Sequence, residues 1–310
     1  MADIVITEFM DESAVARLLA EFEVVYDPTL VDRTQELAPL LAPARALIVR
    51  NRTEVRGDLL EAASRLRCVG RLGVGLDNID TDACAARHIK VYPATGANDL
   101  AVAEYVITSA MLLLRPAYRA SDAVAAGEWP RQRLIGREIA GKTLGLVGYG
   151  SIAREVAWRA HMLGMQILAY DPHVAADHPA WQIARNVSLD GVLELSDVVS
   201  LHVPLTETTR NMIDGPRLST MKKDAILINA ARGGILDEAA LAEALRAGRL
   251  GGAAIDVFES EPLSAETGVR FQGLSNLILT PHIAGVTEES NGRVSHLIAD
   301  KIIRHLKGAA

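Results

Sequence analysis

The fold is decided by the stretch Leu144-Gly145-Leu146-Val147-Gly148-Tyr149-Gly150-Ser151-Ile152-Ala153. It reads as a buried strand that runs through a G-x-G-x-x-A turn into a helix. Gly148 and Gly150 allow a tight turn and let a pyrophosphate approach the backbone, and the N-terminus of the helix then faces the negative charge. Ala153 takes the third position, where a small side chain permits close packing of helix and strand. Without its context, such a pattern favours an ordinary strand–helix turn, so the flanking sequence has to decide.

The next apolar strand, Gln166–Tyr170, ends in Asp171, at about the distance from the glycine turn that a dinucleotide fold requires. An acidic side chain there binds the ribose hydroxyls of adenosine and repels a 2′-phosphate, which favours NAD over NADP. The alternative for Asp171 is a turn residue before Pro172. The predicted cofactor contacts in this region are Gly148, Tyr149, Gly150, Ser151, Ile152 and Asp171.

Two series of alternating strands and helices make up the chain, with apolar runs predicting strands and three- and four-residue spacing predicting helices. The first series has predicted strands at Asp3–Phe9, Val24–Tyr26, Ala46–Arg50, Arg67–Leu72 and Ile89–Tyr92, and helices such as Ser13–Ala20 and Gly57–Arg65. The second has predicted strands at Thr143–Val147, Gln166–Tyr170, Val198–Val203, Ala225–Asn229, Ala253–Val257 and Leu277–Leu279. This alternation predicts the α/β fold class, with two doubly wound parallel sheets.

Two further helices set the predicted domain boundaries. The segment from Asn98 to Tyr118 is apolar nearly all round, which suits a helix buried between domains or in a subunit interface. The segment Glu288–Leu306 is amphipathic and has no strand of its own, so we expect it to return to the N-terminal domain. Residues 1–98 and 285–310 are therefore predicted to form one domain, and residues 99–284 the other.

Composition restricts the partners and the compartment. The chain has 310 residues, of which 49% are hydrophobic and only 4% aromatic, as expected for parallel sheets built from aliphatic residues. The net charge of −7 argues against nucleic acid or a membrane as a partner, but a few local arginines suffice for a small anionic substrate. Cys68 and Cys84 lie in no metal-like cluster, which predicts reduced thiols, no metal and a cytoplasmic protein. The N-terminus reads as a strand rather than a signal peptide, and no apolar run spans a bilayer.

Three later strands each end in a chemically suggestive group, namely Arg232, Glu261 and His282. In an open parallel sheet, ligands bind beyond the carboxyl ends of the strands, so these side chains are expected to converge. Taken singly, they are more simply a solvated loop arginine, a turn acid before proline and a structural histidine. Their occurrence at successive strand ends of one dinucleotide fold favours a catalytic site.

These residue types suit hydride transfer at the C2 carbon of a 2-hydroxy or 2-keto acid. Histidine titrates near neutral pH, so His282 can take the hydroxyl proton in oxidation and return it in reduction. Arg232 can hold the substrate carboxylate in a bidentate manner and polarise the carbonyl oxygen. Glu261 beside His282 would orient the ring and favour its protonated form.

Together these motifs resemble the D-isomer-specific 2-hydroxyacid dehydrogenase family, which includes D-3-phosphoglycerate dehydrogenases. The resemblance covers nearly the whole chain. It rests on the stretches Gly145–Arg154, His202–Ile213, Asn229–Asp237, Asp256–Pro262 and Pro281–Gly285. It implies a Rossmann NAD-binding domain inserted into a flavodoxin-like substrate domain, and the catalytic roles given above for Arg232, Glu261 and His282.

The resemblance also implies further contacts. Those to the cofactor are His202, Val203, Pro204, Thr209, Ala230, Arg232, Asp256, His282 and Gly285. Asp256 is expected near the nicotinamide carboxamide, and Val203, Pro204 and Thr209 around the adenine and the phosphates. The backbone of the loop containing Val74 and Gly75 is expected to meet the substrate carboxylate. Asn98 resembles the hinge residue of the family that lies near the substrate.

The prediction of a charged substrate tail rests on a loop of the first domain. Arg50 and Arg52 lie there, and they are either contacts for a second anionic group or two solvated arginines. The first interpretation predicts an acid with a charged tail, of the 3-phosphoglycerate or 3-sulfolactate type, and the opening stretch Ile4–Glu12 is similar to that of sulfolactate dehydrogenases. The alternatives are reduction of glyoxylate or hydroxypyruvate, or a non-catalytic NAD-sensing protein like the corepressors related to this family.

The segment Gly127–Arg133 follows the long apolar helix. In the resembling family this region forms the dimer interface, which implies a homodimer or a dimer of dimers. Trp129 and Arg131 are either packing residues of that interface or groups that reach the active site of a neighbouring subunit.

Overall fold

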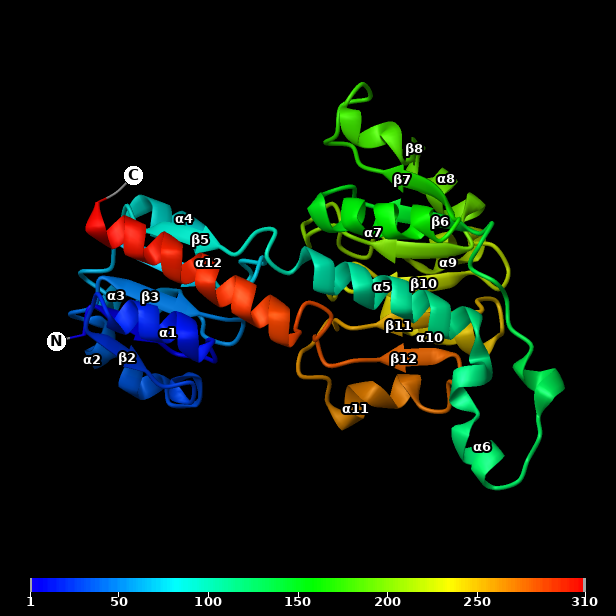
Figure 1. The fold of residues 1–310 in the computed structure, drawn as a ribbon, viewed down its shortest axis with the longest axis horizontal. Coiled ribbons are helices and arrows are strands. Elements are labelled where there is room, and N and C mark those ends of the chain that lie inside the picture. The colour runs from blue at the N-terminus through cyan, green and yellow to red at the C-terminus, as the bar shows by residue number, and fades with distance from the viewer. Residues whose placement is uncertain (1, 309–310) are drawn as a thin grey trace. The chain divides into compact units, whose positions relative to one another are not determined.

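The computed structural model describes residues 2–308 and divides the chain into two compact units. Unit 1 contains the residues up to Asn98 and those from Val286 onward, and unit 2 contains Asp99–Gly285. Each unit is a parallel sheet with helices on both faces (Figure 1). The predicted α/β fold class is therefore confirmed. Residues 1, 309 and 310, which fall within the predicted domain limits, lie outside the described part of the chain.

Unit 1 contains a five-stranded sheet in the order β2-β1-β3-β4-β5, which is the order of flavodoxin-like folds. Its strands are β1 (Ile4–Ile6), β2 (Val24–Tyr26), β3 (Ala46–Val49), β4 (Cys68–Arg71) and β5 (Lys90–Pro93). Its helices are α1 (Glu12–Leu19), α2 (Leu37–Leu41), α3 (Gly57–Ala62), α4 (Thr81–Ala86) and α12 (Glu288–Lys307). Ile4 and Ile6 pack toward α1 and α12 whereas Val5 packs toward α2 and α3, because successive side chains of a strand point to opposite faces.

The C-terminal helix α12 packs within unit 1, on the N-terminal part of the chain. Its buried side chains Val294, Ile298 and Ile302 belong to the same apolar cluster as β1 and α1. The Thr287 hydroxyl accepts from the Ser290 N–H, and the Ser290 hydroxyl accepts from the Thr287 N–H, so the start of the helix is capped reciprocally.

Unit 2 contains a seven-stranded sheet in the order β12-β11-β10-β9-β6-β7-β8. Because β6 is its first strand in the chain, this is the Rossmann order extended by one strand. Its strands are β6 (Thr143–Val147), β7 (Gln166–Tyr170), β8 (Arg185–Asn186), β9 (Val198–Leu201), β10 (Ile226–Asn229), β11 (Gly252–Ile255) and β12 (Leu277–Leu279). Its helices are α5 (Asp99–Leu114), α6 (Ser121–Ala125), α7 (Ser151–Met162), α8 (Leu189–Leu195), α9 (Gly215–Thr220), α10 (Glu238–Arg246) and α11 (Ala265–Gly268).

The long apolar helix α5 ends at Leu114, four residues before the predicted end. Arg115 precedes Pro116, and a residue before proline is disfavoured in the helical conformation. The buried face of α5 packs on α7 and on its own sheet, where the small side chains of Ala103 and Ala110 face an apolar cluster that contains Ala153 of α7. No helix of the described residues is long and apolar enough to cross a membrane.

Candidate active site

The carboxyl ends of the unit 2 strands all lie at one edge of the sheet, because every pairing in it is parallel. Arg232 follows β10, Glu261 follows β11 and His282 follows β12, and these three strands are consecutive neighbours (Figure 1). Adjacent strands are about 4.8 Å apart, so the three loops begin within roughly 10 Å of one another.

The glycine turn between β6 and α7 has the shape that a diphosphate needs. Gly148 has a positive φ of 90°, and a Cβ atom there would lie 2.5 Å from the carbonyl oxygen of His202. A Cβ atom on Gly150 would meet nothing within 4 Å, so the space over the first turn of α7 is open. Ser151 and Ile152 begin the helix, whose N-terminal N–H groups favour an anion. These residues fit the diphosphate of NAD.

Asp171 links the end of β7 to this turn. One carboxylate oxygen accepts the backbone N–H of Tyr149 at 2.8 Å, and the other accepts the N–H of His173 at 2.9 Å. Each carboxylate oxygen has a second lone-pair site, so both remain able to accept from ribose hydroxyls. The ring of Tyr149 is buried and stacks on Trp181, with ring centroids 4.9 Å apart. Tyr149 therefore contributes its backbone to the turn and its side chain to the core.

The loop after β9 packs against the glycine turn. Val203 lies beside Gly148, with a methyl group 3.0 Å from the position of a Cβ. The Thr209 hydroxyl donates to the carbonyl of Pro204 at 2.6 Å and accepts from the N–H of Thr206 at 2.7 Å, which fixes the loop. Nε2 of His202 lies 2.9 Å from the Ser200 hydroxyl, and burial lowers the pKa of His202 to about 4, so this ring is neutral at pH 7.

The loop that carries Arg232 is shaped by Asn229, for which no role was predicted from the sequence. The side-chain amide of Asn229 donates to the carbonyl of Arg232 at 3.0 Å, and its oxygen accepts the N–H of Ala231 at 3.1 Å. A Cβ atom on Gly233 would lie 1.8 Å from the carbonyl oxygen of Phe258, so only glycine lets this loop approach the loop that contains Glu261. Ala230, a predicted cofactor contact, is half-buried and directly follows Asn229 in the chain.

His282 and Glu261 form a hydrogen-bonded pair. Nδ1 of His282 lies 2.7 Å from Oε2 of Glu261, and the side chains are 37% and 31% exposed, respectively. Oε1 of Glu261 accepts the N–H of Phe258 at 2.9 Å. Burial raises the pKa of Glu261, but the hydrogen bonds from His282 and Phe258 and the charges of His282 and Arg232 outweigh it, so the pKa lies below its usual value. A carboxylate that accepts from Nδ1–H leaves Nε2 of His282 for a substrate.

Asp256 holds the loop that presents His282. Its carboxylate is 1% exposed and accepts from the N–H groups of Ile283 and Ala284, both at 2.8 Å, and from the Thr280 hydroxyl at 2.6 Å. The Tyr105 hydroxyl on α5 lies 2.7 Å from that of Thr280. His282 itself has a positive φ of 53°, so this network stabilises a loop conformation that few side chains adopt. The roles of Thr280 and Tyr105 were not predicted from the sequence, in which the position of Thr280 before Pro281 is the one local signal for this network.

In unit 1 the two predicted tail-binding arginines lie in different surroundings. Arg52 is exposed and pairs with Asp32. Arg50 is half-buried, donates from Nη2 to the side chain of Asn291 at 2.7 Å and lies over the ring of Phe9, 5.9 Å from its centroid. Among residues 2–308 no carboxylate forms a direct ion pair with its guanidinium. Burial lowers the pKa of Arg50, and the nearby charge of Glu8 raises it by a smaller amount. A half-buried cation without a direct carboxylate contact suits an anionic ligand.

The remaining predicted substrate residues also lie in unit 1. Val74 and Gly75 are half-buried in the loop after β4, and Asn98 is the last residue of the unit before α5. The side-chain oxygen of Asn98 is buried and has no hydrogen-bond partner within the described part of the chain. Gly285 is the last residue of unit 2. Across residues 2–308, no group of histidine, cysteine or acidic side chains is arranged to hold a metal.

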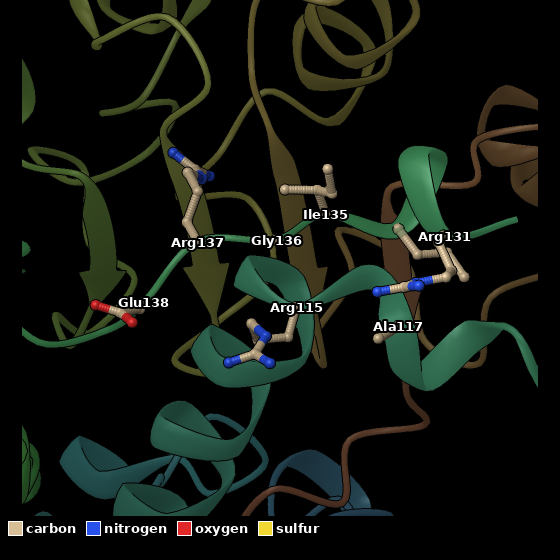
Figure 2. Close-up of a pocket in the computed structure, with 8 residues that line it drawn as sticks. Arg115, Ala117, Arg131, Ile135, Gly136, Arg137 and Glu138 are labelled. Atoms are coloured by element: carbon tan, nitrogen blue, oxygen red, sulfur yellow. The ribbon is translucent and has the colours of Figure 1, made fainter.

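A separate pocket of about 460 Å³ lies in unit 2 on the segment that follows α5 (Figure 2). It is lined by Arg115, Ala117, Arg131, Leu134, Ile135, Gly136, Arg137 and Glu138. None of these residues belongs to the loops at the strand ends. Trp129 on the same segment is 75% exposed, and Tyr118 and Ile135 are similarly exposed. The segment therefore presents several large apolar side chains at the surface.

Comparisons with known proteins point to one family. The family of the D-isomer specific 2-hydroxyacid dehydrogenase NAD binding domain matches residues 107–284. The chain is 56% identical over 307 residues to the (S)-sulfolactate dehydrogenase of Chromohalobacter salexigens, with 99% of both chains covered. It is 40% identical over 274 residues to a D-3-phosphoglycerate dehydrogenase of Archaeoglobus fulgidus, with 88% of this chain and 52% of that one covered. The crystal structure of D-lactate dehydrogenase from Aquifex aeolicus, complexed with NAD and lactic acid, matches with a TM-score of 0.85, 28% identity and coverage of 99% and 96%.

The chain belongs to the D-isomer specific 2-hydroxyacid dehydrogenase family. It is an NAD-dependent oxidoreductase that acts on a small 2-hydroxy or 2-keto acid, as the glycine turn and the strand-end residues predicted.

The role of Asp171 in cofactor choice can be measured directly. Asp171→Ser removes the charge that repels a 2′-phosphate, so the ratio of kcat/KM for NADH to that for NADPH should fall by at least about tenfold. Asp190→Ser, which removes an exposed acid at the start of α8, is the control and should leave the ratio unchanged. An unchanged ratio in Asp171→Ser would contradict the ribose assignment.

Proposed function

We propose that this dehydrogenase interconverts a three-carbon 2-hydroxy acid carrying a sulfonate tail, 3-sulfolactate, and its 2-keto acid, with Arg232, Glu261 and His282 as the catalytic residues. The observation that carries the proposal is the His282–Glu261 hydrogen bond of 2.7 Å at the same sheet edge as Arg232. Identity of 56% along the whole length to an (S)-sulfolactate dehydrogenase supports the choice of substrate.

The side chains of unit 2 divide the chemistry between them. Bound NAD supplies the hydride acceptor in oxidation and, as NADH, the hydride donor in reduction. His282 takes the C2 hydroxyl proton at Nε2 while Glu261 stabilises the resulting imidazolium through Nδ1–H. Arg232 binds the carboxylate at C1 and orients C2, and its charge also favours the alkoxide-like oxygen that develops during the transfer. In reduction the same proton returns from His282 to the C2 oxygen.

The tail of the substrate is assigned to unit 1. The half-buried Arg50 makes no direct ion pair, whereas the exposed Arg52 pairs with Asp32. We therefore assign the sulfonate to Arg50 alone. The loop containing Val74 and Gly75 supplies backbone N–H groups to the substrate carboxylate, and Asn98 lies near it. A phosphate ester also presents three oxygens on a tetrahedral centre and is negatively charged, although its charge at pH 7 is between about −1.5 and −2 and a sulfonate carries a single charge. 3-Phosphoglycerate is therefore the second candidate, and the 40% identity to a D-3-phosphoglycerate dehydrogenase favours testing it.

The catalytic assignment makes a kinetic prediction. His282→Ala should lower kcat by about 10²- to 10⁴-fold, because the proton acceptor is lost, while the Kd for NADH in a fluorescence titration changes far less, since His282 is one cofactor contact among many. Arg232→Ala should raise KM and lower kcat together. His161→Ala, on the exposed face of α7, is the control and should behave as wild type. Turnover by His282→Ala at the wild-type rate would refute the assignment.

A substrate panel tests the tail. Of 3-sulfopyruvate, 3-phosphohydroxypyruvate, hydroxypyruvate, glyoxylate and pyruvate, the first should have the highest kcat/KM with NADH. Arg50→Ala should raise its KM by at least about tenfold and leave that of pyruvate unchanged, because a charge-assisted contact is lost. Arg52→Ala is the matched control and should change neither. Equal kcat/KM values for tailed and tail-less acids would refute the sulfonate proposal, and binding of NADH without turnover of any acid would favour a sensor.

We also propose that the protein is a cytoplasmic homodimer that associates through the segment after α5. The exposed side chains of Tyr118, Trp129 and Ile135 support an interface there, and the buried, unpaired Cys68 and Cys84 suit a reducing compartment.

The interface is tested by sedimentation velocity. Trp129→Asp places a charge within the proposed contact and should convert a dimer to a monomer. Trp158→Asp, at a comparably exposed tryptophan of α7, should leave the dimer intact. Wild-type protein that sediments as a monomer would contradict the proposal.

A further inference from the structure

Glu8, at the carboxyl end of β1, is surrounded by the backbone of the loop after β3. Its Oε1 accepts the N–H groups of Arg50 at 2.9 Å and Thr53 at 3.0 Å. Its Oε2 accepts those of Asn51 at 3.3 Å and Arg52 at 3.2 Å. The residue is 5% exposed. Four consecutive N–H groups thus converge on one carboxylate, as in the backbone nests that bind free anions.

The opposite side of the same loop is also held. The side-chain amide of Asn78 donates to the carbonyl of Thr53 at 2.7 Å and to that of Arg50 at 3.3 Å. The Thr53 hydroxyl lies 2.8 Å from that of Thr7, and Asn78, Thr53 and Thr7 are all buried. Because side chains hold both the N–H and the carbonyl sides, the path of the loop is fixed. The direction in which Arg50 leaves it is therefore fixed as well.

The guanidinium of Arg50 is then held at its far end by Asn291 and by the ring of Phe9. Glu8 makes no direct ion pair with it, and both carboxylate oxygens accept from the backbone, although the charge of Glu8 still raises the pKa of Arg50 through space. The carboxylate also fills the nest, so the N–H groups of the loop are not available to a substrate anion. A tail in this region can be recognised by the Arg50 side chain but not by the loop backbone.

We propose that Glu8 is a positioning residue for substrate selection. Its carboxylate occupies the backbone nest and so fixes the loop from Arg50 to Thr53. The fixed loop directs the side chain of Arg50 at an anionic substrate tail. The inference rests on the proposed function of Arg50. It assigns to Glu8 an effect on the KM of tailed substrates, with no part in the transfer of hydride or proton.

The test is Glu8→Gln, which keeps the size of the side chain but turns an amide NH2 toward backbone N–H donors. KM for 3-sulfopyruvate should rise at least about tenfold, while kcat, the KM for pyruvate and the Kd for NADH stay within about twofold. Glu54→Gln, one residue beyond the loop at an exposed carboxylate, is the matched control and should change none of them. An unchanged KM for 3-sulfopyruvate, or an equal rise for both acids, would overturn the proposal.

Arg50→Ala, assayed in parallel, separates the two ideas. If Arg50→Ala loses the discrimination between 3-sulfopyruvate and pyruvate and Glu8→Gln retains it, the proposed function stands and the role of Glu8 is refuted. If Arg50→Ala retains the discrimination, the assignment of the tail to Arg50 fails instead.

If Glu8→Gln does not fold, hydrogen exchange of the wild-type protein tests the premise that Glu8 fixes the loop. The amides of residues 50–53 should be strongly protected, although Asn51 and Arg52 have exposed side chains. Exchange at the rate of an open loop would overturn the proposal.

Discussion

In both units, the loops that carry candidate site residues are held by carboxylates that accept hydrogen bonds from backbone N–H groups. In unit 2, Asp256 binds the N–H groups of Ile283 and Ala284. In unit 1, Glu8 does the same for the loop from Arg50 to Thr53. The chemical reason is common to both sheets. Where parallel strands end, the backbone leaves the ladder, and its N–H groups need another acceptor if they are buried.

The acids that hold the loops at this sheet edge are more deeply buried than the acid proposed to act in catalysis. Asp256 is 1% exposed, and both of its oxygens are engaged by the loop that it supports. The side chain of Glu261 is 31% exposed and divides its oxygens between the N–H of Phe258 and the ring of His282. Asp171 is an intermediate case, since it fixes the glycine turn through Tyr149 and still has capacity for a ribose.

Most residues of the candidate site could be predicted from the sequence because their signals are local. A glycine turn after a strand, an acid at the end of the next strand, and three chemically distinct groups after later strands can all be read within a few residues. The boundaries of elements were less accurate: α5 ends at Leu114 because of Pro116. The strand β8 was missed because its two residues are too few for a period to be visible.

The sequence by itself determined the order of strands and helices, the dinucleotide turn and the types of group available for hydride transfer, because these depend on periodicity and on the conformational freedom of single residues. The tertiary structure decided which partners residues of the same type have. It alone paired Arg52 with Asp32 and left Arg50 with Asn291, 241 positions away, and it alone joined Tyr105 to Thr280. Hydrogen-bond partners so distant in the chain are set by the packing of separate elements, and no local pattern records them.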